Sequence, residues 1–512
     1  MTMPCPMSSN ANLYSLLKSR FPDLSTDAFE LVSGQRLTYG ALEAKVARFA
    51  GALKHCNIGA ADRVTVQVEK SLENVALYLA CLQVGAIYNP LNTAYTAAEL
   101  AYFIGDAEPK LVVCAPEKRR ELEAIVATTG TARLETLDAD GAGSLADMAS
   151  VATPLDEIAN VGPDDLAALL YTSGTTGRAK GAMITHGNLS SNIAALHQAW
   201  HFVPGDVLLH ALPIYHVHGL FVALGTALYN GSKILWLQKF DIKAVLEMLP
   251  RATVMMGVPT FYTRLLEAPE FGAETVRHMR LFVSGSAPLL AETHRQFYER
   301  TGHAILERYG MTETGMITSN PYDGDRIAGT VGFPLPGISL RAAKQDGSPC
   351  APGEPGVIEV KGPNVFKGYW RMPEKTAEEF RADGYFITGD IGVIAPDGRV
   401  SIVGRAKDLI ITGGFNVYPK EIEVEIDALD GVVESAVVGV PHPDFGEGVI
   451  AVVAAEPGKI SERDVIASLE PKLAKFKLPK RVFFVDDLPR NAMGKVQKAD
   501  LRAQYANSFS KT

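Results

Sequence analysis

The densest cluster of residues that could do chemistry lies in the segment YTSGTTGRAKG, residues 171–181. An apolar run that reads as a buried strand leads into it. Gly174 and Gly177 accept positive φ angles, so backbone N–H groups can point inward at an anion. The segment also supplies hydroxyl donors and one point charge, from Ser173, Thr175, Thr176 and Lys180. These residues predict a polyphosphate-binding loop, and the alternative is a surface turn.

This loop differs from a P-loop at two positions. A GxxxxGK[ST] pattern that began at Gly174 would need Gly at 179 and a hydroxyl residue at 181, but the chain has Ala179 and Gly181. The hydroxyl that holds Mg²⁺ in a P-loop is therefore missing. Residues 182–185 read as a strand rather than a helix. The differences argue against a P-loop NTPase.

The elements that would position this loop alternate along the first half of the chain. Residues 42–52 and 72–82 are predicted helices, and 111–113 and 166–171 are predicted buried strands. Such alternation is typical of βαβ units with a mostly parallel sheet. The uncharged run 75–89 reads as a buried helix and is too short to span a bilayer.

The second half has a different pattern. Residues 356–361 and 398–403 alternate apolar and polar side chains, with Asp397-Gly398 as a hairpin turn, which predicts antiparallel strands. A compact α+β tail follows, with a helix at 419–429, strands at 436–440 and 450–455, and a helix at 462–473. We place a boundary near residues 405–408. The predicted fold is α/β, with a large domain over 1–406 and a small domain over 407–512.

Composition excludes several classes of protein. The 512 residues are 47% hydrophobic and 21% charged, which excludes a disordered, collagen-like or coiled-coil chain. The net charge of −9 argues against sequence-independent binding to nucleic acid. Five isolated cysteines form no CxxC pair and indicate neither a zinc ribbon nor a disulfide framework. No signal peptide is visible at the N-terminus, so we expect a soluble cytoplasmic protein without membrane or nucleic-acid partners.

Five further segments, together with the loop, resemble the ordered motifs of the adenylate-forming superfamily. This superfamily contains acyl-CoA synthetases, luciferases and the adenylation domains of peptide synthetases. The segments are ERYGMTE (307–313), YFITGD with GRAKD (385–390 and 404–408), ITGGFNVYPKE (411–421) and PRNAMGK (489–495). The match covers essentially the whole chain. It implies ATP, Mg²⁺ and coenzyme A as cofactor and co-substrates, a β-barrel-like subdomain at the end of the large domain, and a mobile C-terminal domain.

The resemblance assigns the nucleotide side of the site. Glu313 suits Mg²⁺, which takes one or two carboxylates plus phosphate oxygens, and Thr312 suits an α-phosphate donor. Tyr309 is implied to stack on adenine, although a core tyrosine is the alternative. Asp390 and Arg405 are implied to bind the ribose. The predicted cofactor-binding residues are Thr172, Ser173, Gly174, Thr175, Thr176, Gly177, Lys180, Tyr309, Gly310, Asp390, Arg405, Gly413 and Gly414.

The resemblance also implies two conformations. Lys495 would enter the site during adenylation, where a cation between the acid and the α-phosphate stabilises developing charge. The C-terminal domain would then turn about the hinge Lys407, and Gly413-Gly414 would approach the pantetheine. Lys495 is also implied to be a target of lysine acetylation and deacetylation enzymes.

The acid-binding residues are predicted from a helix that opens at Pro259. Phe261, Tyr262, Leu265 and Leu266 form an apolar stripe, and Arg264 lies just off its edge. A solvated boundary arginine is one interpretation. The resemblance favours a second one, in which Arg264 holds a distal carboxylate bidentately, as in malonyl-CoA synthetases.

Two polar segments support the same assignment. In SGSAP (284–288), Ser286 adds a hydroxyl where many relatives have alanine. In PIYHVHG (213–219), His216 is implied to lie beside the acyl carboxylate, and His218 is as well explained by the core.

We therefore expect a malonate–CoA ligase that forms malonyl-AMP, releasing pyrophosphate and then AMP, with methylmalonate as a further candidate substrate. A short-chain or aromatic acyl-CoA ligase is the alternative in the same class. A nucleotide-binding module without ligase chemistry would need neither Lys495 nor Glu313. An enzyme that loads a carrier protein is a third alternative, and no carrier domain is fused to this sequence.

Overall fold

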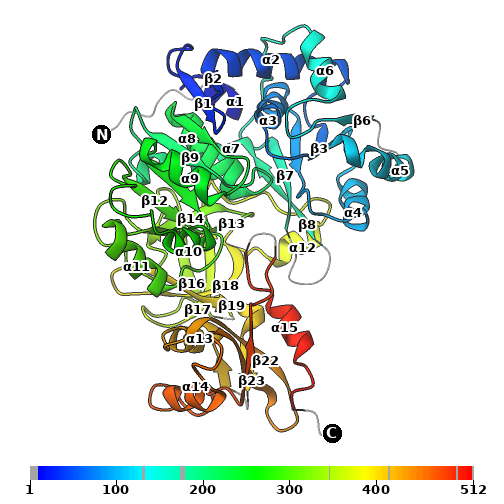
Figure 1. Ribbon diagram of the computed structural model, residues 1–512. Coiled ribbons are helices and arrows are strands. Elements are labelled where there is room, and N and C mark those ends of the chain that lie inside the picture. The colour runs from blue at the N-terminus through cyan, green and yellow to red at the C-terminus, as the bar shows by residue number, and fades with distance from the viewer. Residues whose placement is uncertain are drawn as a thin grey trace.

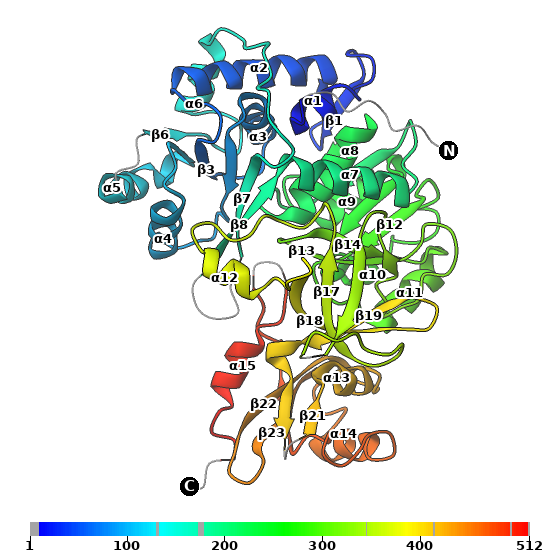
Figure 2. The same ribbon diagram turned by 180° about the vertical axis from the view of Figure 1, so that it is seen from behind.

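The computed structural model of the chain describes residues 10–129, 133–172, 179–344, 346–412, 415–491 and 494–509. A large body carries the N-terminus, and a smaller lobe, formed from β20 onward, lies at its lower end (Figures 1 and 2). Two large sheets form the body, and one antiparallel sheet connects it to the lobe. The described residues contain no helix that is long and apolar enough to cross a bilayer.

The first large sheet has the strand order β6-β5-β3-β4-β7-β8 and is parallel except for the last pair. Its strands are β3 (Arg63–Gln67), β4 (Ile87–Pro90), β5 (Leu111–Cys114), β6 (Arg133–Thr136), β7 (Leu166–Thr172) and β8 (Lys180–Thr185). The helices that accompany it are α2 (Tyr39–His55), α3 (Leu72–Val84), α4 (Ala97–Ala107), α5 (Arg119–Thr129) and α6 (Ser144–Val151), with a 3₁₀ turn η1 (Pro116–Lys118). The predicted alternation of helices and parallel strands is confirmed.

The second large sheet has the order β15-β14-β13-β12-β11-β9-β10-β1-β2 and is parallel from β13 to β1. Its strands are β1 (Asp27–Leu31), β2 (Arg36–Thr38), β9 (Val207–His210), β10 (Lys233–Trp236), β11 (Val254–Gly257), β12 (Leu281–Ser284), β13 (Leu306–Met311), β14 (Gly315–Ser319) and β15 (Phe333–Pro334). Its helices are α1 (Leu13–Lys18), α7 (His186–Ala199), the π-helix η2 (His218–Leu224), α8 (Gly225–Asn230), α9 (Ile242–Met248), η3 (Leu249–Arg251), α10 (Pro259–Glu267) and α11 (Ala291–Thr301).

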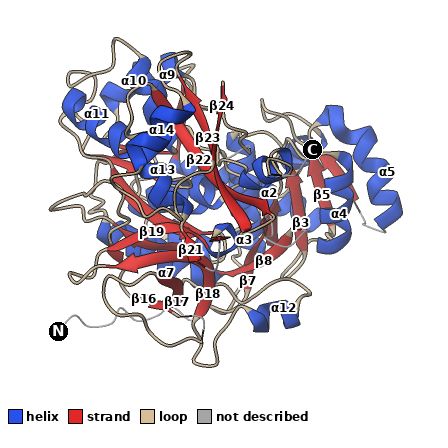
Figure 3. Ribbon diagram, turned by 90° about the horizontal axis from the view of Figure 1, so that it is seen from below, coloured by secondary structure: helices blue, strands red, loops and turns tan. Residues whose placement is uncertain are grey.

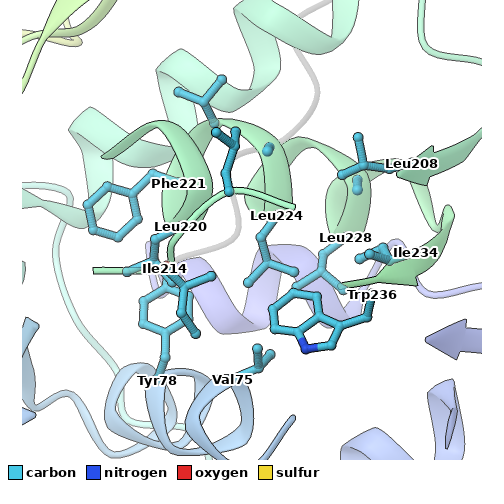
Figure 4. Close-up of a cluster of buried hydrophobic side chains, with 14 of the residues drawn as sticks. Val75, Tyr78, Leu208, Ile214, Leu220, Phe221, Leu224, Leu228, Ile234 and Trp236 are labelled. Atoms are coloured by element: carbon cyan, nitrogen blue, oxygen red, sulfur yellow. The ribbon is translucent and has the colours of Figure 1, made fainter. Parts of the chain in front are cut away.

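A shared core joins the two sheets. Figure 4 shows Val75 and Tyr78 of α3 facing Leu220, Phe221 and other side chains of η2 and α8. The prediction of one buried helix over 75–89 is wrong in its extent. The chain leaves α3 at Gly85, whose φ of 75° ends the helix, and continues as β4. Periodicity could not show this division, because helix and strand are both almost fully buried here.

The antiparallel sheet β16-β17-β18-β19 follows. It comprises β16 (Ser339–Ala343), β17 (Gly356–Lys361), β18 (Phe386–Ile394) and β19 (Val400–Arg405), and α12 (Pro373–Glu378) lies in the connection before β18. The predicted hairpin is confirmed, since β18 and β19 pair around a turn in which Gly398 has a φ of 88°. A 3₁₀ turn, η4 (Ala406–Asp408), leads out of the sheet into the lobe.

The lobe is an α+β unit with helices on both faces of one sheet (Figures 1 and 3). Its strands are β20 (Ile410–Thr412), β21 (Phe415–Val417), β22 (Val432–His442), β23 (Gly446–Ala455) and β24 (Arg481–Val485), and its helices are α13 (Pro419–Asp427), α14 (Glu462–Leu469) and α15 (Lys498–Gln504). Val437 packs with α13 and α14, whereas its neighbour Val438 packs with α15, as strand alternation requires. The predicted helix over 462–473 ends early, at Leu469, because Pro471 has no N–H with which to continue the helical hydrogen bonds.

Candidate active site

The carboxyl ends of three parallel strands meet at one edge of the second large sheet. In the registered ladder, Gly257 of β11 lies beside Ser284 of β12, and Ser284 lies beside Glu307 of β13. Ligands of open α/β sheets bind outside the carboxyl ends of the strands. Arg264 lies in α10, which follows β11, and Ser286 follows β12; the predicted histidines follow β9, the strand beside β11.

A buried arginine, Arg308, dominates this edge. Its side chain belongs to β13 and the residue is only 5% exposed, yet its Nε and Nη2 atoms have no hydrogen-bond partner among the described residues. Gly285 makes room for it, because a Cβ at that position would lie 2.2 Å from the Arg308 Cζ atom. Burial lowers the pKa of the Arg308 guanidinium to about 9. A buried cation with free donors is suited to an anionic ligand.

Ser286 and His218 lie at the same edge. The hydroxyl of Ser286 is 3.2 Å from His218 Nδ1, and Ser286 adopts a positive φ of 71°, uncommon for a residue other than glycine. His218 is 1% exposed and its Nε2 atom has no partner in the described chain. Burial, with the charge of Arg308, lowers the pKa of His218 well below its usual value. The structure therefore brings Ser286, His218 and the cation Arg308 together at this edge of the sheet, and we call this cluster the acid subsite.

His216 links this subsite to the lobe. Its pKa is lowered to about 3, mainly by desolvation and further by the charges of Lys495 and Arg308. The imidazole is therefore neutral near pH 7 and is close enough to both cations to be affected by their charges. This placement suits a group that contacts a carboxylate without bringing a charge of its own.

Arg264 is placed differently. The predicted apolar stripe is confirmed, since Phe261, Tyr262 and Leu265 of α10 are buried, whereas Arg264 is exposed. Among the described residues it has no hydrogen-bond or ion-pair partner. Thr260, one turn before it on the same helix face, is the nearest neighbour of Gly494, where a Cβ would lie 3.9 Å from the Thr260 Cγ2 atom. The face of α10 that carries Arg264 therefore turns toward the Lys495 loop, and its role toward an acid remains a prediction.

The predicted nucleotide side gathers around Glu313. Thr172, at the end of β7, donates to Glu313 Oε1 over 3.4 Å, and the Tyr369 hydroxyl is 3.1 Å from the same atom. Glu313 is 5% exposed, and burial raises its pKa. Within the part of the chain that the structure describes, three or more metal-ligating side chains do not gather at any point. A buried carboxylate without a cationic hydrogen-bond partner fits Mg²⁺ that takes its other ligands from phosphate and water.

Lys180 is held beside this group. Its Nζ atom donates to Glu379 at 2.8 Å and lies 4.0 Å from the centre of the Tyr369 ring. Tyr369 in turn donates to Glu379 at 2.7 Å. Tyr369 and Glu379 were not predicted from the sequence, since neither lies in a recognised motif. The rest of the predicted phosphate loop, residues 173–178, lies outside the described residues, as do Gly413 and Gly414.

The residue predicted to stack on adenine and the two predicted to bind the ribose form one cluster. Tyr309 donates to Asp390 at 2.5 Å, and Arg405 Nε lies 2.6 Å from the other oxygen of the same carboxylate. Burial raises the pKa of Asp390, and the charge of Arg405 opposes that rise. Thr312 and Gly310, also predicted, belong to the β13–β14 hairpin that carries Tyr309. The structure thus brings Tyr309, Asp390 and Arg405 together.

Lys495 faces both halves of the site. Although part of its side chain is accessible to solvent, surrounding protein desolvates the ammonium and, with the charge of Arg405, lowers its pKa. The carboxylates Asp390 and Glu313 and the cation Arg308 are all close enough to act on its charge. The backbone N–H of Lys495 donates to Asn491 at 3.0 Å. The predicted hinge, Lys407, lies in η4, where Asp408 pairs with Arg502 of α15 at 2.6 Å.

Comparison with known proteins finds similarity to AMP-binding enzymes along most of the chain. Residues 20–370 match the profile of AMP-binding enzymes, and residues 421–495 match that of the AMP-binding enzyme C-terminal domain. A malonate–CoA ligase of Arabidopsis thaliana is 36% identical over 504 residues, covering 92% of this chain and 81% of the relative. A feruloyl-CoA synthase of Amycolatopsis is 36% identical over 479 residues, covering 92% and 94%. The crystal structure of ATP-bound MatB from Rhodopseudomonas palustris is 58% identical, with a TM-score of 0.96 and coverage of 98% and 100%.

Proposed function

The chain belongs to the AMP-binding enzyme family, and from that premise we propose that it is an ATP-dependent malonate–CoA ligase that works through malonyl-AMP. Among the relatives at 36% identity the acid differs, since a malonate ligase and a feruloyl-CoA synthase are equally similar to this chain. The observation that carries the proposal is the buried Arg308 guanidinium, whose Nε and Nη2 atoms lack partners in the described residues. An apolar acyl chain would leave this cation unpaired, whereas a second carboxylate would pair with it.

The two carboxylates of malonate have different tasks in this proposal. The distal one accepts hydrogen bonds from Arg308 and from the Ser286 hydroxyl at the acid subsite. A buried, unpaired charge is costly, and a bidentate guanidinium–carboxylate pair offsets much of that cost on both sides. The reactive carboxylate then lies toward His216 and Lys495, the neutral and cationic groups between the subsite and the nucleotide.

In the first step an oxygen of the reactive carboxylate attacks the α-phosphorus of ATP. A phosphorus–oxygen bond forms, the bond to the β-phosphate oxygen breaks, and pyrophosphate leaves. Lys495 offsets charge on both anions and on the developing transition state. Tyr309, Asp390 and Arg405 orient the adenosine. Glu313 would hold Mg²⁺, which neutralises phosphate charge when bound.

In the second step the thiol of coenzyme A attacks the acyl carbon of malonyl-AMP. A carbon–sulfur bond forms, the bond from the acyl carbon to AMP breaks, and the thiol proton passes to solvent. The closeness of Lys495 to Asp390 and Glu313 supports a turn of the lobe between the steps, which would withdraw Lys495 before the thiol enters. We assign that turn to Lys407 in η4, where no sheet ladder constrains the chain.

A panel of acids tests the proposal. Pyrophosphate release would be measured with acetate, malonate, methylmalonate, succinate, butyrate, benzoate, ferulate and sulfoacetate at matched concentrations. We expect the highest kcat/KM with malonate and weaker turnover with methylmalonate. Preference for butyrate, benzoate or ferulate over malonate would contradict the proposal and favour a ligase for monocarboxylic acids.

Lys495 is also the proposed target of lysine acetylation. Its side chain is partly accessible to solvent, and acetylation removes the charge that the first step needs. Acetylated protein should lose malonate-dependent pyrophosphate release and regain it on treatment with a deacetylase. Mass spectrometry would locate the modification, and activity that is retained at full Lys495 acetylation would contradict the assignment.

A further inference from the structure

A second buried cation, Lys70, lies behind the acid subsite. It follows β3, it is only 6% exposed, and no Asp or Glu lies within 4.0 Å of its Nζ atom in the described chain. Lysines are almost never fully buried unless an acidic group pairs with them. This one therefore needs another explanation.

The contacts of Lys70 account for all three of its ammonium hydrogens. The Nζ atom lies 2.9 Å from His210 Nδ1, 2.9 Å from the His210 carbonyl oxygen and 2.6 Å from the Leu237 carbonyl oxygen. The ring of Trp236 lies on another side, with its centre 4.0 Å from Nζ. Burial lowers the pKa of Lys70, but three acceptors and an aromatic face favour the charged form.

These contacts select one tautomer of His210. If Lys70 donates to Nδ1, that atom carries no hydrogen, and the hydrogen of the neutral ring is on Nε2. His210 Nε2 lies 2.9 Å from the Gly219 carbonyl oxygen, to which it can then donate. The opposite tautomer would place the Nε2 lone pair against that carbonyl oxygen and lose the bond. Burial and the charge of Lys70 both lower the pKa of His210, which keeps the ring neutral.

Gly219 is the second residue of η2, and the subsite histidines flank it. The loop that carries His216 passes directly over Gly219, since a Cβ there would lie 2.0 Å from the Pro213 carbonyl oxygen. His218 precedes it and contacts Ser286. Further along, Leu220 and Phe221 of η2 are buried in the core shared with α3, which begins at Leu72 (Figure 4). The hydrogen bond from His210 thus fixes the start of η2 at Gly219, while the rest of η2 is held by packing in the core.

We propose that Lys70 is a positioning residue for the acid subsite: it holds His210 in the Nε2–H tautomer, and His210 fixes Gly219 and with it His216 and His218. The inference rests on the proposed function only for the identity of the acid. It requires that Lys70 act through a hydrogen bond of defined direction and not merely by filling space.

Two substitutions of His210 distinguish the effect of the hydrogen bond to Gly219 from the effect of filling space. The amide nitrogen of His210→Gln reaches the position of Nε2 and can still donate to Gly219, whereas the amide of His210→Asn reaches only the position of Nδ1. We expect kcat/KM for the acid to stay within about threefold of wild type in His210→Gln and to fall by about tenfold to a hundredfold in His210→Asn. The KM for ATP should change in neither variant.

A rescue completes the test. Lys70→Met releases the tautomer and should lower kcat/KM for the acid by about tenfold or more. The double variant Lys70→Met/His210→Gln should recover most of that loss, because glutamine donates to Gly219 without needing the lysine. Lys110→Met, which removes a half-exposed lysine paired with Asp62, is the matched control and should behave as wild type.

Equal losses in His210→Gln and His210→Asn, or a double variant no better than Lys70→Met, would overturn the inference. The comparison of His210→Gln with His210→Asn tests the inference even if Lys70→Met does not fold. All rates are measured with the acid that the wild type uses best. If that acid is not malonate, the proposed function fails while the positioning role is still judged by the same ratios.

Discussion

The acid subsite and the nucleotide side of the site hold their charges in opposite ways. At the acid subsite, Arg308 is buried with two donor atoms that lack partners in the described residues. On the nucleotide side, Asp390 is paired with Arg405, and Lys180 with Glu379. A carboxylate that reaches Arg308 supplies a missing counter-ion, whereas Asp390, Arg405 and Lys180 on the nucleotide side already have partners in the protein.

This contrast in charge pairing indicates which residues determine the choice of acid. Binding at an unpaired buried cation depends strongly on whether the ligand carries a matching anion. A ligand that binds at charges already paired within the protein replaces existing contacts with new ones. Its affinity therefore depends less on its own charge. We therefore expect acid-side substitutions to alter the choice of acid, and nucleotide-side substitutions to affect all acids alike.

Lys495→Ala should have the largest effect, because this residue faces both regions. Malonate-dependent pyrophosphate release should fall by about three decades or more, since the cation acts where charge develops in the transition state. ATP binding, followed by titration, should remain nearly intact, and thioester formation from supplied malonyl-AMP should be impaired much less. Lys475→Ala, an exposed lysine of the lobe, is the control. Equal losses in both half-reactions would refute a role confined to adenylation.

Lys407→Pro should affect the opposite half-reaction. Proline fixes φ near −65° and stiffens the proposed hinge, so thioester formation should fall by about tenfold to a hundredfold while adenylation stays within about threefold of wild type. The two half-reactions are measured separately, by pyrophosphate release and by malonyl-CoA formation, with Lys407→Ala as the control. Loss of adenylation with intact thioester formation would place the hinge elsewhere.

Ser286→Ala should shift the choice of acid by a smaller amount. The substitution keeps a Cβ at the same positive φ, so backbone strain is matched and only the hydroxyl is lost. One neutral donor is worth about 1 kcal/mol, which corresponds to a fall of about fivefold in the malonate-to-butyrate ratio of kcat/KM. A ratio equal to that of wild type would remove Ser286 from the acid subsite.

Glu307→Gln should change stability with pH and leave the acid preference nearly unaltered. Glu307 precedes Arg308 in β13 and points to the opposite face, where it accepts from the Gly329 N–H at 3.0 Å. Burial raises its pKa to about 8, so between its usual value of 4.5 and pH 8 the folded state binds more protons than the unfolded state. The free energy of unfolding should then fall as pH rises through this range, by at most about 1.4 kcal/mol per pH unit.

Thermal denaturation between pH 5 and pH 9 checks this expectation. Glutamine mimics the protonated acid and keeps the acceptor, so the decline with rising pH should be weaker in the variant. An unchanged pH dependence would show that Glu307 ionises normally in the folded protein.

More of the fold than of the acid subsite could be predicted from the sequence. Alternating patterns predicted the βαβ body, the Asp397-Gly398 hairpin and the elements of the lobe, because these follow from local periodicity. The boundary between α3 and β4 could not be predicted, because both elements are buried on all sides and show no periodic pattern. The motifs pointed to Tyr309, Asp390, Arg405 and Lys495, which the structure brings together.

The partners of buried charges could not be predicted in this way. Arg308 stands inside the ERYGMTE motif, and a cation within a buried strand was a signal that it needs a partner. Whether one exists depends on the register of β12 and β13 and on the small Gly285. Lys70 and His210 meet across 140 positions of sequence, so no local pattern relates them.

The central claim is that Arg308 selects the dicarboxylate, and one comparison of two arginines tests it most directly. The measurement is the ratio of kcat/KM for malonate to that for butyrate in wild type, Arg308→Met and Arg264→Leu. Breaking a buried ion pair costs roughly 3–5 kcal/mol, so the account predicts a fall of about two to four decades in Arg308→Met. It also predicts unchanged or higher thermal stability of the empty variant, because an unpaired buried charge is removed. The exposed Arg264 should have the smaller effect. A ratio within about threefold of wild type in Arg308→Met, with a collapse in Arg264→Leu, would contradict the account and move the distal carboxylate to α10.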